Sequence, residues 1–293
     1  MQNYENAIEL SGVTKRYEGF TLDGVSFNVP KGSIMGFIGQ NGAGKTTTIR
    51  SMLNITEIDG GKIRLLGLDH IGDEFAVKSR LAAVFDELPF HEVLNAADMA
   101  RIFAGLYPEW DNGVYSEYLD RFGLPLKKKI GQYSKGMKMK LQIACALSHN
   151  AELLVMDEAT TGLDPVVRDE ILHIFMEYLR DGERSILMSS HITVDLEKIA
   201  DSVTFIDKGK ILLTGCKDVI LETHGILKCG RNEAGDIDKA DIVSVRENEF
   251  GAEVMLSDRE SGLRKYSGAV IDRASLDDIM LYYVHKGEMG WRQ

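Results

Sequence analysis

The stretch GQNGAGKT, residues 39–46, decides the fold predicted for this chain. It matches the pattern GxxxxGK[ST], in which glycines let the backbone turn its N–H groups inward around phosphate oxygens. A short apolar segment, residues 33–38, precedes it, and residues 45–53 follow with the apolar spacing of a helix. A strand, a glycine-rich turn and a helix N-terminus in this order are typical of a phosphate-binding loop.

The side chains at the end of this loop suit a nucleoside triphosphate and its metal ion. Lys45 would place a cation beside the β- and γ-phosphates, and the Thr46 hydroxyl would coordinate a magnesium ion that bridges two phosphates. Thr47 can add a phosphate contact. The loop residues predicted to bind ATP are Gly39, Gln40, Asn41, Gly42, Ala43, Gly44, Lys45, Thr46 and Thr47.

Two adjacent carboxylates, Asp157 and Glu158, follow the apolar run of residues 153–156. Alone, an acidic pair at a strand end is as often a solvated turn as a site. Behind a phosphate loop, the pair suits ATP hydrolysis: Asp157 would hold magnesium through a water molecule, and Glu158 would polarise the attacking water. The sequence therefore predicts Asp157 as a metal residue and Glu158 as the catalytic base.

A phosphate loop alone leaves kinases, GTPases and helicases open, and a third segment separates these classes. Residues 133–147 read YSKGMKMKLQIACAL. On its own this segment predicts an amphipathic helix that Ser134 caps and whose apolar side chains include Met137, Leu141 and Ala144.

The order and spacing of the three motifs resemble the ATP-binding subunit of ABC transporters, over residues 8–215. In that family, a signature of LSGGQ type opens a helix before the strand that ends in the acidic pair. The signature serine and glycine reach the γ-phosphate bound to a partner subunit. Here the signature reads YSKGM, and the resemblance implies action across a dimer by Ser134, Lys135, Gly136 and Met137.

Three further positions extend the resemblance. Tyr17, in KRY, resembles the aromatic residue that stacks on adenine. Asp164, in TGLDP, resembles the D-loop residue that faces the other protomer. His191, in SSHI, resembles the switch histidine that touches the γ-phosphate. A lone histidine is more often structural, but its place in this series of motifs favours a catalytic role.

The sequence also departs from the family pattern. Lys135 and Met137 replace two signature residues, and Ala159 replaces a proline that usually follows the acidic pair. In VFDEL, residues 84–88, Asp86 stands about where the family has a glutamine, with Glu87 as the alternative equivalent. Asp86 is therefore a further candidate magnesium ligand. A third carboxylate beside the acidic pair should also raise the pKa of one carboxyl group of the cluster.

The expected fold class is α/β: a P-loop NTPase core with an N-terminal antiparallel β-subdomain, an inserted helical subdomain and a small C-terminal α+β extension. Residues 8–29 alternate apolar and polar side chains and predict two antiparallel strands around Gly19. Residues 86–150 show helical spacing and predict the inserted subdomain. Short apolar runs flank a helix within residues 153–188, which predicts a parallel sheet.

We expect two domains, an ATP-binding domain at residues 1–216 and a C-terminal accessory region at residues 217–293. In the accessory region, residues 242–245 and 253–256 predict strands. Ser275, followed at the third residue by Asp278, predicts a capping box that opens a final helix.

Composition excludes several classes of protein. The 293 residues are 44% hydrophobic and 27% charged, which is typical of a soluble globular protein. The net charge of -11 disfavours nucleic acid as a partner, and residues 127–129 with Lys135, Lys138 and Lys140 are expected to form a solvated lysine face. Three cysteines without CxxC spacing predict neither disulfides nor a zinc site.

The sequence predicts where the protein acts. The N-terminus lacks the basic and apolar regions of a secretory signal, and no segment approaches the roughly 20 apolar residues that span a bilayer. We therefore expect a cytoplasmic protein that lies peripherally on the cytoplasmic face of the cell membrane through a membrane-spanning transporter subunit. A second nucleotide-binding subunit is the other expected partner, in a homodimer or a heterodimer, and ATP and Mg²⁺ are the expected cofactors.

The motifs are compatible with three functions. The leading one is hydrolysis of ATP to ADP and phosphate, coupled to transport by a separate membrane subunit. The signature variant and the added C-terminal tail resemble bacterial export systems. A soluble ABC-type ATPase with a non-transport macromolecular partner is disfavoured by the single phosphate loop, the acidic charge and the lack of a long heptad run. A silent module that binds ATP only to dimerise is disfavoured by Glu158 and His191.

Overall fold

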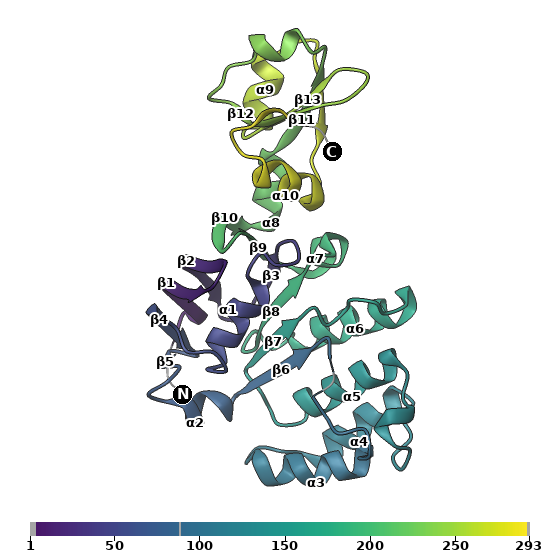
Figure 1. The fold of residues 1–293 in the computed structure, drawn as a ribbon. Helices are drawn as coiled ribbons and strands as arrows, with labels where there is room; N and C mark the ends of the chain where they lie inside the picture. Colours follow the sequence, from purple (N-terminus) through teal and green to yellow (C-terminus); the bar gives the residue numbers. More distant parts are fainter. Residues whose placement is uncertain (1–3, 88, 292–293) are drawn as a thin grey trace.

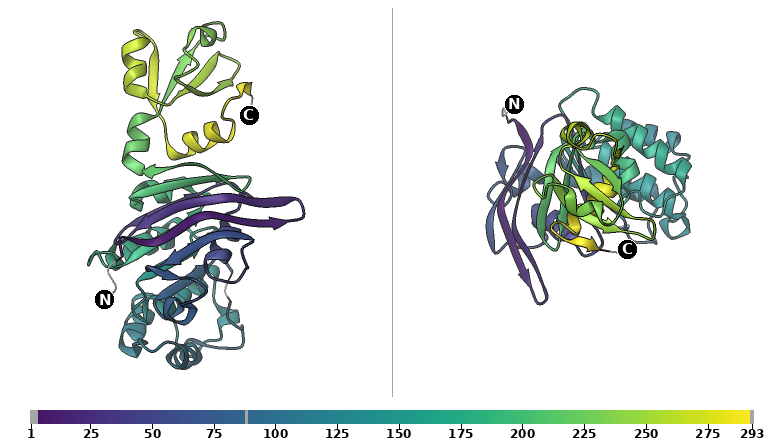
Figure 2. Two further views of the ribbon diagram at one scale, coloured as in Figure 1. Left: turned by 90° about the vertical axis from the view of Figure 1, so that its left-hand side faces the viewer. Right: turned by 90° about the horizontal axis from the view of Figure 1, so that it is seen from above.

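Three β-sheets organise the residues that the computed structural model describes, 4–87 and 89–291 (Figure 1). The N-terminal sheet is antiparallel, in the order β2-β1-β4-β5. Its β1–β2 hairpin turns at Gly19, whose φ is 83°, and projects from the core in Figure 2, as the alternating pattern predicts. Its strands are β1 (Asn6–Tyr17), β2 (Phe20–Pro30), β4 (Gly60–Leu65) and β5 (Leu68–Asp69).

The central sheet has the order β10-β9-β3-β8-β7-β6, and all of its strands except β10 run parallel. Strands β3, β7 and β8 are buried along their whole length, as continuous apolar runs in parallel sheets are. Their carboxyl ends therefore meet at one edge of the sheet. The strands are β3 (Ile34–Ile38), β6 (Leu81–Phe85), β7 (Leu153–Asp157), β8 (Ser185–Ser190), β9 (Ser202–Asp207) and β10 (Lys210–Cys216).

Helices surround the central sheet and form the predicted insertion. Ser134 caps α5 by accepting a hydrogen bond from the Met137 N–H at 3.2 Å, as predicted. The helices of the core are α1 (Lys45–Met52), α2 (Glu74–Lys78), α6 (Pro165–Tyr178) and α7 (Thr193–Ile199). The inserted helices are α3 (Ala96–Leu106), α4 (Asn112–Arg121), the 3₁₀ turn η1 (Ile130–Gln132) and α5 (Lys135–Leu147).

The start of the insertion differs from the prediction. Helical spacing begins near Asp86 in the sequence, but helix α3 begins only at Ala96. Pro89 lacks an N–H to donate within a helix, and the Asn95 side chain accepts a hydrogen bond from the Asp98 N–H and so fixes the start of α3. Among the described residues, no helix is long and apolar enough to cross a membrane.

The C-terminal residues form a third sheet, in the order β14-β11-β13-β12-β15, at the end of the molecule opposite to α3 and α4 (Figure 1). Helix α8 leads into it directly after β10 ends at Cys216. The elements are α8 (Lys217–Thr223), β11 (Gly225–Cys229), η2 (Glu233–Asp236), β12 (Ile242–Glu247), β13 (Ala252–Leu256), α9 (Arg259–Lys265), β14 (Val270–Arg273), α10 (Leu276–Val284) and β15 (Met289–Trp291).

Helix α10 joins this sheet to the core. It begins with the predicted Ser275 capping box, and the Leu276 N–H donates to Glu197 Oε1 at 2.8 Å from the end of α7. Cys145, Cys216 and Cys229 are free thiols. The division after residue 216 stays a prediction, and its outer limits, residues 1 and 293, lie outside the described residues.

Candidate active site

The phosphate loop joins β3 to α1 and requires glycine at several positions. Gly42 and Gly44 have φ of 81° and 117°, in the left-handed region that favours glycine. A Cβ on Gly39 would lie 2.5 Å from the Ile206 carbonyl oxygen, and one on Gly44 would lie 2.9 Å from Leu22 Cδ2. The loop can therefore keep this path only with glycine at these positions.

Lys45 connects this loop to the end of β7. Its side chain is only 5% exposed, and Nζ donates hydrogen bonds to the carbonyl oxygens of Gly39, at 2.6 Å, and Gln40, at 3.3 Å. The same Nζ lies 3.0 Å from Glu158 Oε1. Thr46, the next residue, is exposed, so its hydroxyl is accessible to a ligand.

The acidic pair follows β7 in a conformation that separates the two side chains. Asp157 is buried, and its Oδ1 accepts a hydrogen bond from Ser189 Oγ at 2.6 Å. Glu158 has φ of 56°, a left-handed conformation that costs a non-glycine residue of order 1 kcal/mol. Its Oε2 accepts from Thr161 Oγ1 at 2.8 Å and lies 2.6 Å from His191 Nδ1. The structure thus brings Lys45, Glu158 and His191 together.

The charges around Glu158 set its protonation. Burial by itself raises the pKa of the Glu158 carboxyl group, but the hydrogen bonds from Lys45 and Thr161 and the charges of Lys45 and His191 lower that pKa below its ordinary value. The expectation that clustered carboxylates raise the pKa is wrong for Glu158, because hydrogen bonds from Lys45 and Thr161 lower its pKa and together outweigh burial. Glu158 is ionised at neutral pH in this arrangement.

The signature residues meet the D-loop at the start of two helices. A Cβ on Gly136 would lie 3.6 Å from Val167 Cγ1, so the first turns of α5 and α6 are neighbours. Asp164 caps α6 by accepting hydrogen bonds from the N–H groups of Val166 and Val167, both at 3.1 Å. Ser134, Gly136 and Asp164 therefore belong to one surface formed by the beginnings of α5 and α6.

Asp86 lies close to the acidic pair through its backbone but not through its carboxylate. Its N–H donates to the Asp157 carbonyl oxygen at 3.0 Å, whereas its Oδ1 lies 2.6 Å from Lys135 Nζ. A role for Asp86 at magnesium stays a prediction, and it requires the carboxylate to leave Lys135. Of the predicted solvated lysine face, residues 127–129 and Lys135 are exposed, whereas Lys138 and Lys140 are partly buried and pair with Glu92 and Glu170.

Tyr17 ends β1 beside the hairpin turn, where its ring is exposed. Lys15 Nζ lies 5.6 Å from the ring centroid. Across the turn, Phe20 comes close to the phosphate loop, since its Cζ would lie 3.1 Å from a Cβ on Gly44. The hairpin thus places an exposed aromatic ring near the loop, where a base could stack on it.

Comparison with known proteins agrees with this geometry. A family model described as ABC transporter matches residues 22–161. The bacitracin transport ATP-binding protein BcrA of Bacillus licheniformis is 35% identical over 208 residues, which are 70% of this chain and 68% of that protein. The chain belongs to the ABC transporter ATP-binding family. It is an ATP-binding and ATP-hydrolysing subunit of this family, and transport is the supported function.

Two further matches extend the likeness of this ABC subunit. The daunorubicin resistance ATP-binding protein DrrA3 of Streptomyces coeruleorubidus is 30% identical over 259 residues, 86% of this chain and 78% of that protein. A solved structure of the ATP-binding subunit of an ABC transporter has a TM-score of 0.67 and 28% identity, and the match covers 73% of this chain and 91% of that one. The predicted fold is thereby confirmed.

Two further residues hold the acidic pair of the ABC subunit and were not predicted from the sequence. Ser189 donates its hydroxyl to Asp157, and its Oγ accepts the Glu158 N–H at 3.2 Å. Thr161 donates to the Glu158 carboxylate. Ser189 lies one residue before the end of β8, the strand next to β7, and two residues before His191, so its place beside a predicted site residue is the signal that could have found it. For Thr161, the only signal in the sequence was its position three residues after Glu158.

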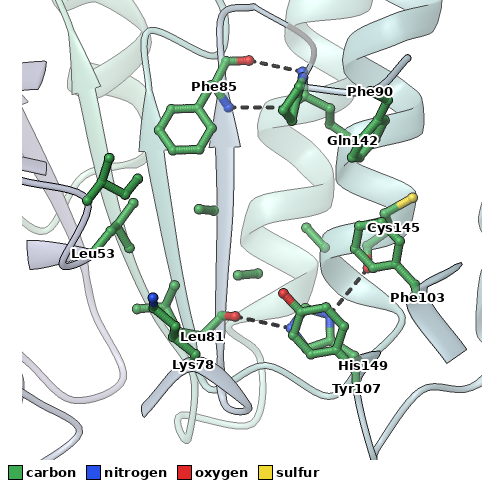
Figure 3. Close-up of a pocket in the computed structure, with 15 residues that line it drawn as sticks. Leu53, Lys78, Leu81, Phe85, Phe90, Phe103, Tyr107, Gln142, Cys145 and His149 are labelled. Carbon is green, nitrogen blue, oxygen red and sulfur yellow. Dashed lines mark hydrogen bonds between the residues drawn. The ribbon is translucent and has the colours of Figure 1, made fainter. Parts of the chain in front are cut away.

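An apolar groove lies between β6 and the inserted helices of the ABC subunit (Figure 3). Its volume is about 280 Å³, and Phe85, Phe90, Phe103 and Tyr107 contribute aromatic rings to its walls. Gln142 closes one end, because its Nε2 donates to the Phe85 carbonyl at 3.0 Å and its Oε1 accepts the Phe85 N–H at 3.2 Å. Phe85, the residue before Asp86, is therefore held at this end of the groove.

Proposed function

We propose that Glu158 is the general base of ATP hydrolysis, that His191 positions it, and that Lys45 holds its carboxylate until ATP binds. The observation that carries this proposal is the convergence of both residues on the Glu158 carboxylate, at 3.0 and 2.6 Å. Hydrogen-bond reach to a catalytic base is the first geometric requirement of such a site. Thr161 holds the same carboxylate from a third side, which orients it in the strained turn after β7.

Lys45 links nucleotide binding to the basicity of Glu158. A phosphate-loop lysine binds the β- and γ-phosphates, so the nucleotide would compete with Glu158 for the Lys45 ammonium. Removal of that hydrogen bond takes away the strongest influence that lowers the pKa of Glu158. The carboxylate then becomes a better proton acceptor when the triphosphate is bound.

The donor set at this site fits magnesium. Thr46 offers an accessible hydroxyl, and Asp157 offers a carboxylate that Ser189 fixes by a hydrogen bond. Hydroxyl and carboxylate oxygens are the ligands that this hard cation prefers. These two residues would hold magnesium, which when bound neutralises charge on the transferring phosphate.

The surface at the beginnings of α5 and α6 supports a dimer with a second nucleotide-binding subunit. Ser134, Gly136 and Asp164 lie there together, while Lys45 and Glu158 lie at the carboxyl edge of the central sheet. In our proposal, each subunit supplies the phosphate loop for one ATP and the signature for the other, in a homodimer or a heterodimer. Tyr17 stacks on the adenine, and Lys135 and Met137 complete the signature turn.

Replacement of Glu158 by Gln tests the proposal. The amide keeps the shape of the side chain but cannot accept the proton of the attacking water, so hydrolysis should fall at least about 100-fold. ATP should still bind, and gel filtration with ATP should show a dimer. Glu117→Gln, on the exposed face of α4, is the matched control and should hydrolyse ATP normally. A Glu158→Gln chain that stays monomeric and fully active contradicts the proposal.

We propose that the apolar groove receives a cytoplasmic segment of a membrane-spanning transporter subunit. The groove is aromatic, and the end of α3 continues the apolar surface through Leu106, which is 65% exposed. Apolar surface of this kind is typical of binding sites for an amphipathic helix. Because Gln142 ties the groove to Phe85, a segment seated there can act on the loop that contains Asp86.

Co-expression with a candidate membrane-spanning transporter subunit tests this partner. Leu106→Glu places a charge at the groove rim and should reduce recovery of the chain with membranes. Phe250→Glu changes a residue that is 96% exposed in the C-terminal sheet and should leave recovery unchanged. Equal loss by both variants, or recovery with membranes in the absence of the partner, contradicts the proposal. The cargo, which we propose is exported, is selected by the membrane subunit.

A further inference from the structure

Two ion pairs connect the signature turn to the segment that follows β6. Lys135 Nζ lies 2.6 Å from Asp86 Oδ1, and Lys138 Nζ lies 3.2 Å from Glu92 Oε1. Lys135 and Lys138 are three residues apart and so share one face of α5. Asp86 and Glu92 lie in the loop between β6 and α3. We refer to these two ion pairs as the clasp.

The clasp borders a cavity. About 420 Å³ of space lies between the loop and α5, and all four residues of the clasp line it, together with Phe90 and Met139. The second half of α5 is different, because Leu141, Ile143 and Ala144 are fully buried in the core. Packing therefore fixes the end of the helix, whereas the Ser134 cap and the clasp hold its exposed first turn.

Lys135 holds a central position in this arrangement. It lies between Ser134 and Gly136, the two signature residues that act across the proposed dimer. Its Nζ would lie 3.1 Å from a Cβ on Gly162, so its side chain also covers the D-loop. Asp86 and Lys135 are two positions at which the sequence departs from the family pattern, and the structure pairs them. The negative charge that replaces a glutamine thus has a specific partner.

We propose that the clasp positions the signature turn for its action on the ATP bound to the other subunit. Asp86 and Lys135 are positioning residues in this proposal, which rests on the proposed function. The phosphate loop does not include them, so they should affect turnover and not the affinity of one subunit for ATP. Both side chains are more than a third exposed, so loss of their ion pair should reduce kcat by up to about fivefold.

Neutralising and charge-reversing variants of the full chain test the clasp. Asp86→Asn and Lys135→Gln should each lower kcat with an unchanged KM for ATP. The double variant Asp86→Lys with Lys135→Asp restores opposite charges and should recover most of the loss. Lys140 lies on α5 like the lysines of the clasp, but it does not line the cavity, and its Nζ lies 2.7 Å from Glu170. Lys140→Gln breaks this ion pair and should leave kcat unchanged.

The competing role of Asp86 gives a different result. If Asp86 binds magnesium, Asp86→Asn raises the magnesium concentration for half-maximal hydrolysis and the double variant gives no recovery, which overturns the clasp. Amide hydrogen exchange of residues 133–139 in the nucleotide-free chain does not depend on hydrolysis. It should be faster in Asp86→Asn than in Lys140→Gln, and equal exchange also overturns the clasp. If the unchanged chain does not hydrolyse ATP, but Asp86→Asn still shows faster exchange than Lys140→Gln, only the proposed function is refuted.

Discussion

Lys45 shows how much one buried cation does in this chain. It satisfies two carbonyl oxygens of its own loop and faces the carboxylate of Glu158. A buried ammonium needs such partners, because desolvation without them is costly. In the proposed function, the Lys45 ammonium exchanges the Glu158 carboxylate for a phosphate of ATP with little change of position.

Lys45→Ala should abolish ATP binding, because the γ-phosphate loses its direct cationic partner. Titration calorimetry with ATP and magnesium measures the effect. Lys62→Ala removes an exposed lysine of β4 and serves as the control, with normal affinity expected. Tight ATP binding by the Lys45 variant would show that the loop binds phosphate without its lysine and that our assignment of this residue is wrong.

Among the elements, short side-chain caps mark the starts of the inserted helices. The inserted helices α3, α4 and α5 begin after Asn95, Asp111 and Ser134, and each cap accepts backbone N–H groups of the first turn. Caps of this type satisfy N–H groups that have no partner within the helix. The same device fixes α10, which connects the C-terminal sheet to the core.

Ser275→Ala should destabilise the C-terminal region by about 1 kcal/mol, the usual cost of losing such a cap. The Ser275 hydroxyl accepts the Asp278 N–H at 3.1 Å, and no methyl group can replace it. Scanning calorimetry should show a lower unfolding temperature for the C-terminal transition, with unchanged ATP hydrolysis. Ser267→Ala, in an exposed loop, is the control. Identical unfolding of the two variants would mean that the cap does not hold α10.

The whole molecule carries a pH-dependent term in its stability. His70, His149 and His224 are almost fully buried, in three different parts of the fold. Burial is the main cause that lowers the pKa of each, although carbonyl contacts oppose it. In the unfolded chain, these side chains have a pKa of about 6.5. The unfolded chain therefore binds more protons below that pH, and the free energy of unfolding falls as the pH falls.

His149→Gln should reduce this acid sensitivity. The glutamine cannot titrate, so the slope of stability against pH below about 6.5 should decrease by up to about 1.4 kcal/mol per pH unit, the value for one proton. Urea unfolding at about pH 7 and about pH 5 measures the slope. His173→Gln, at an exposed position of α6, is the control and should keep the slope of the natural chain. If the slope of stability against pH is unchanged in His149→Gln, His149 does not contribute to the acid sensitivity.

Residue types and their spacing along the chain were enough to predict the local features of this protein. Residues 39–46 specify their loop through glycines that a tight turn requires, and Ser134 and Ser275 mark helix starts because a cap acts within three residues. Asp157 and Glu158 stand out because they end a buried apolar strand. All of these depend on neighbours along the chain, which periodicity and residue type describe directly.

Only the tertiary structure decided which distant residues meet. The strand order β9-β3-β8-β7-β6 does not follow the chain, yet it brings Lys45, Glu158 and His191 to one edge of the sheet. The fold also pairs the Asp86 carboxylate with Lys135 and not with a metal site beside the acidic pair, and it places the Ser189 hydroxyl where it donates to Asp157. The physical reason is that charge and hydrogen bonding act over a few ångströms of space, whereas spacing in the sequence records distance along the chain only.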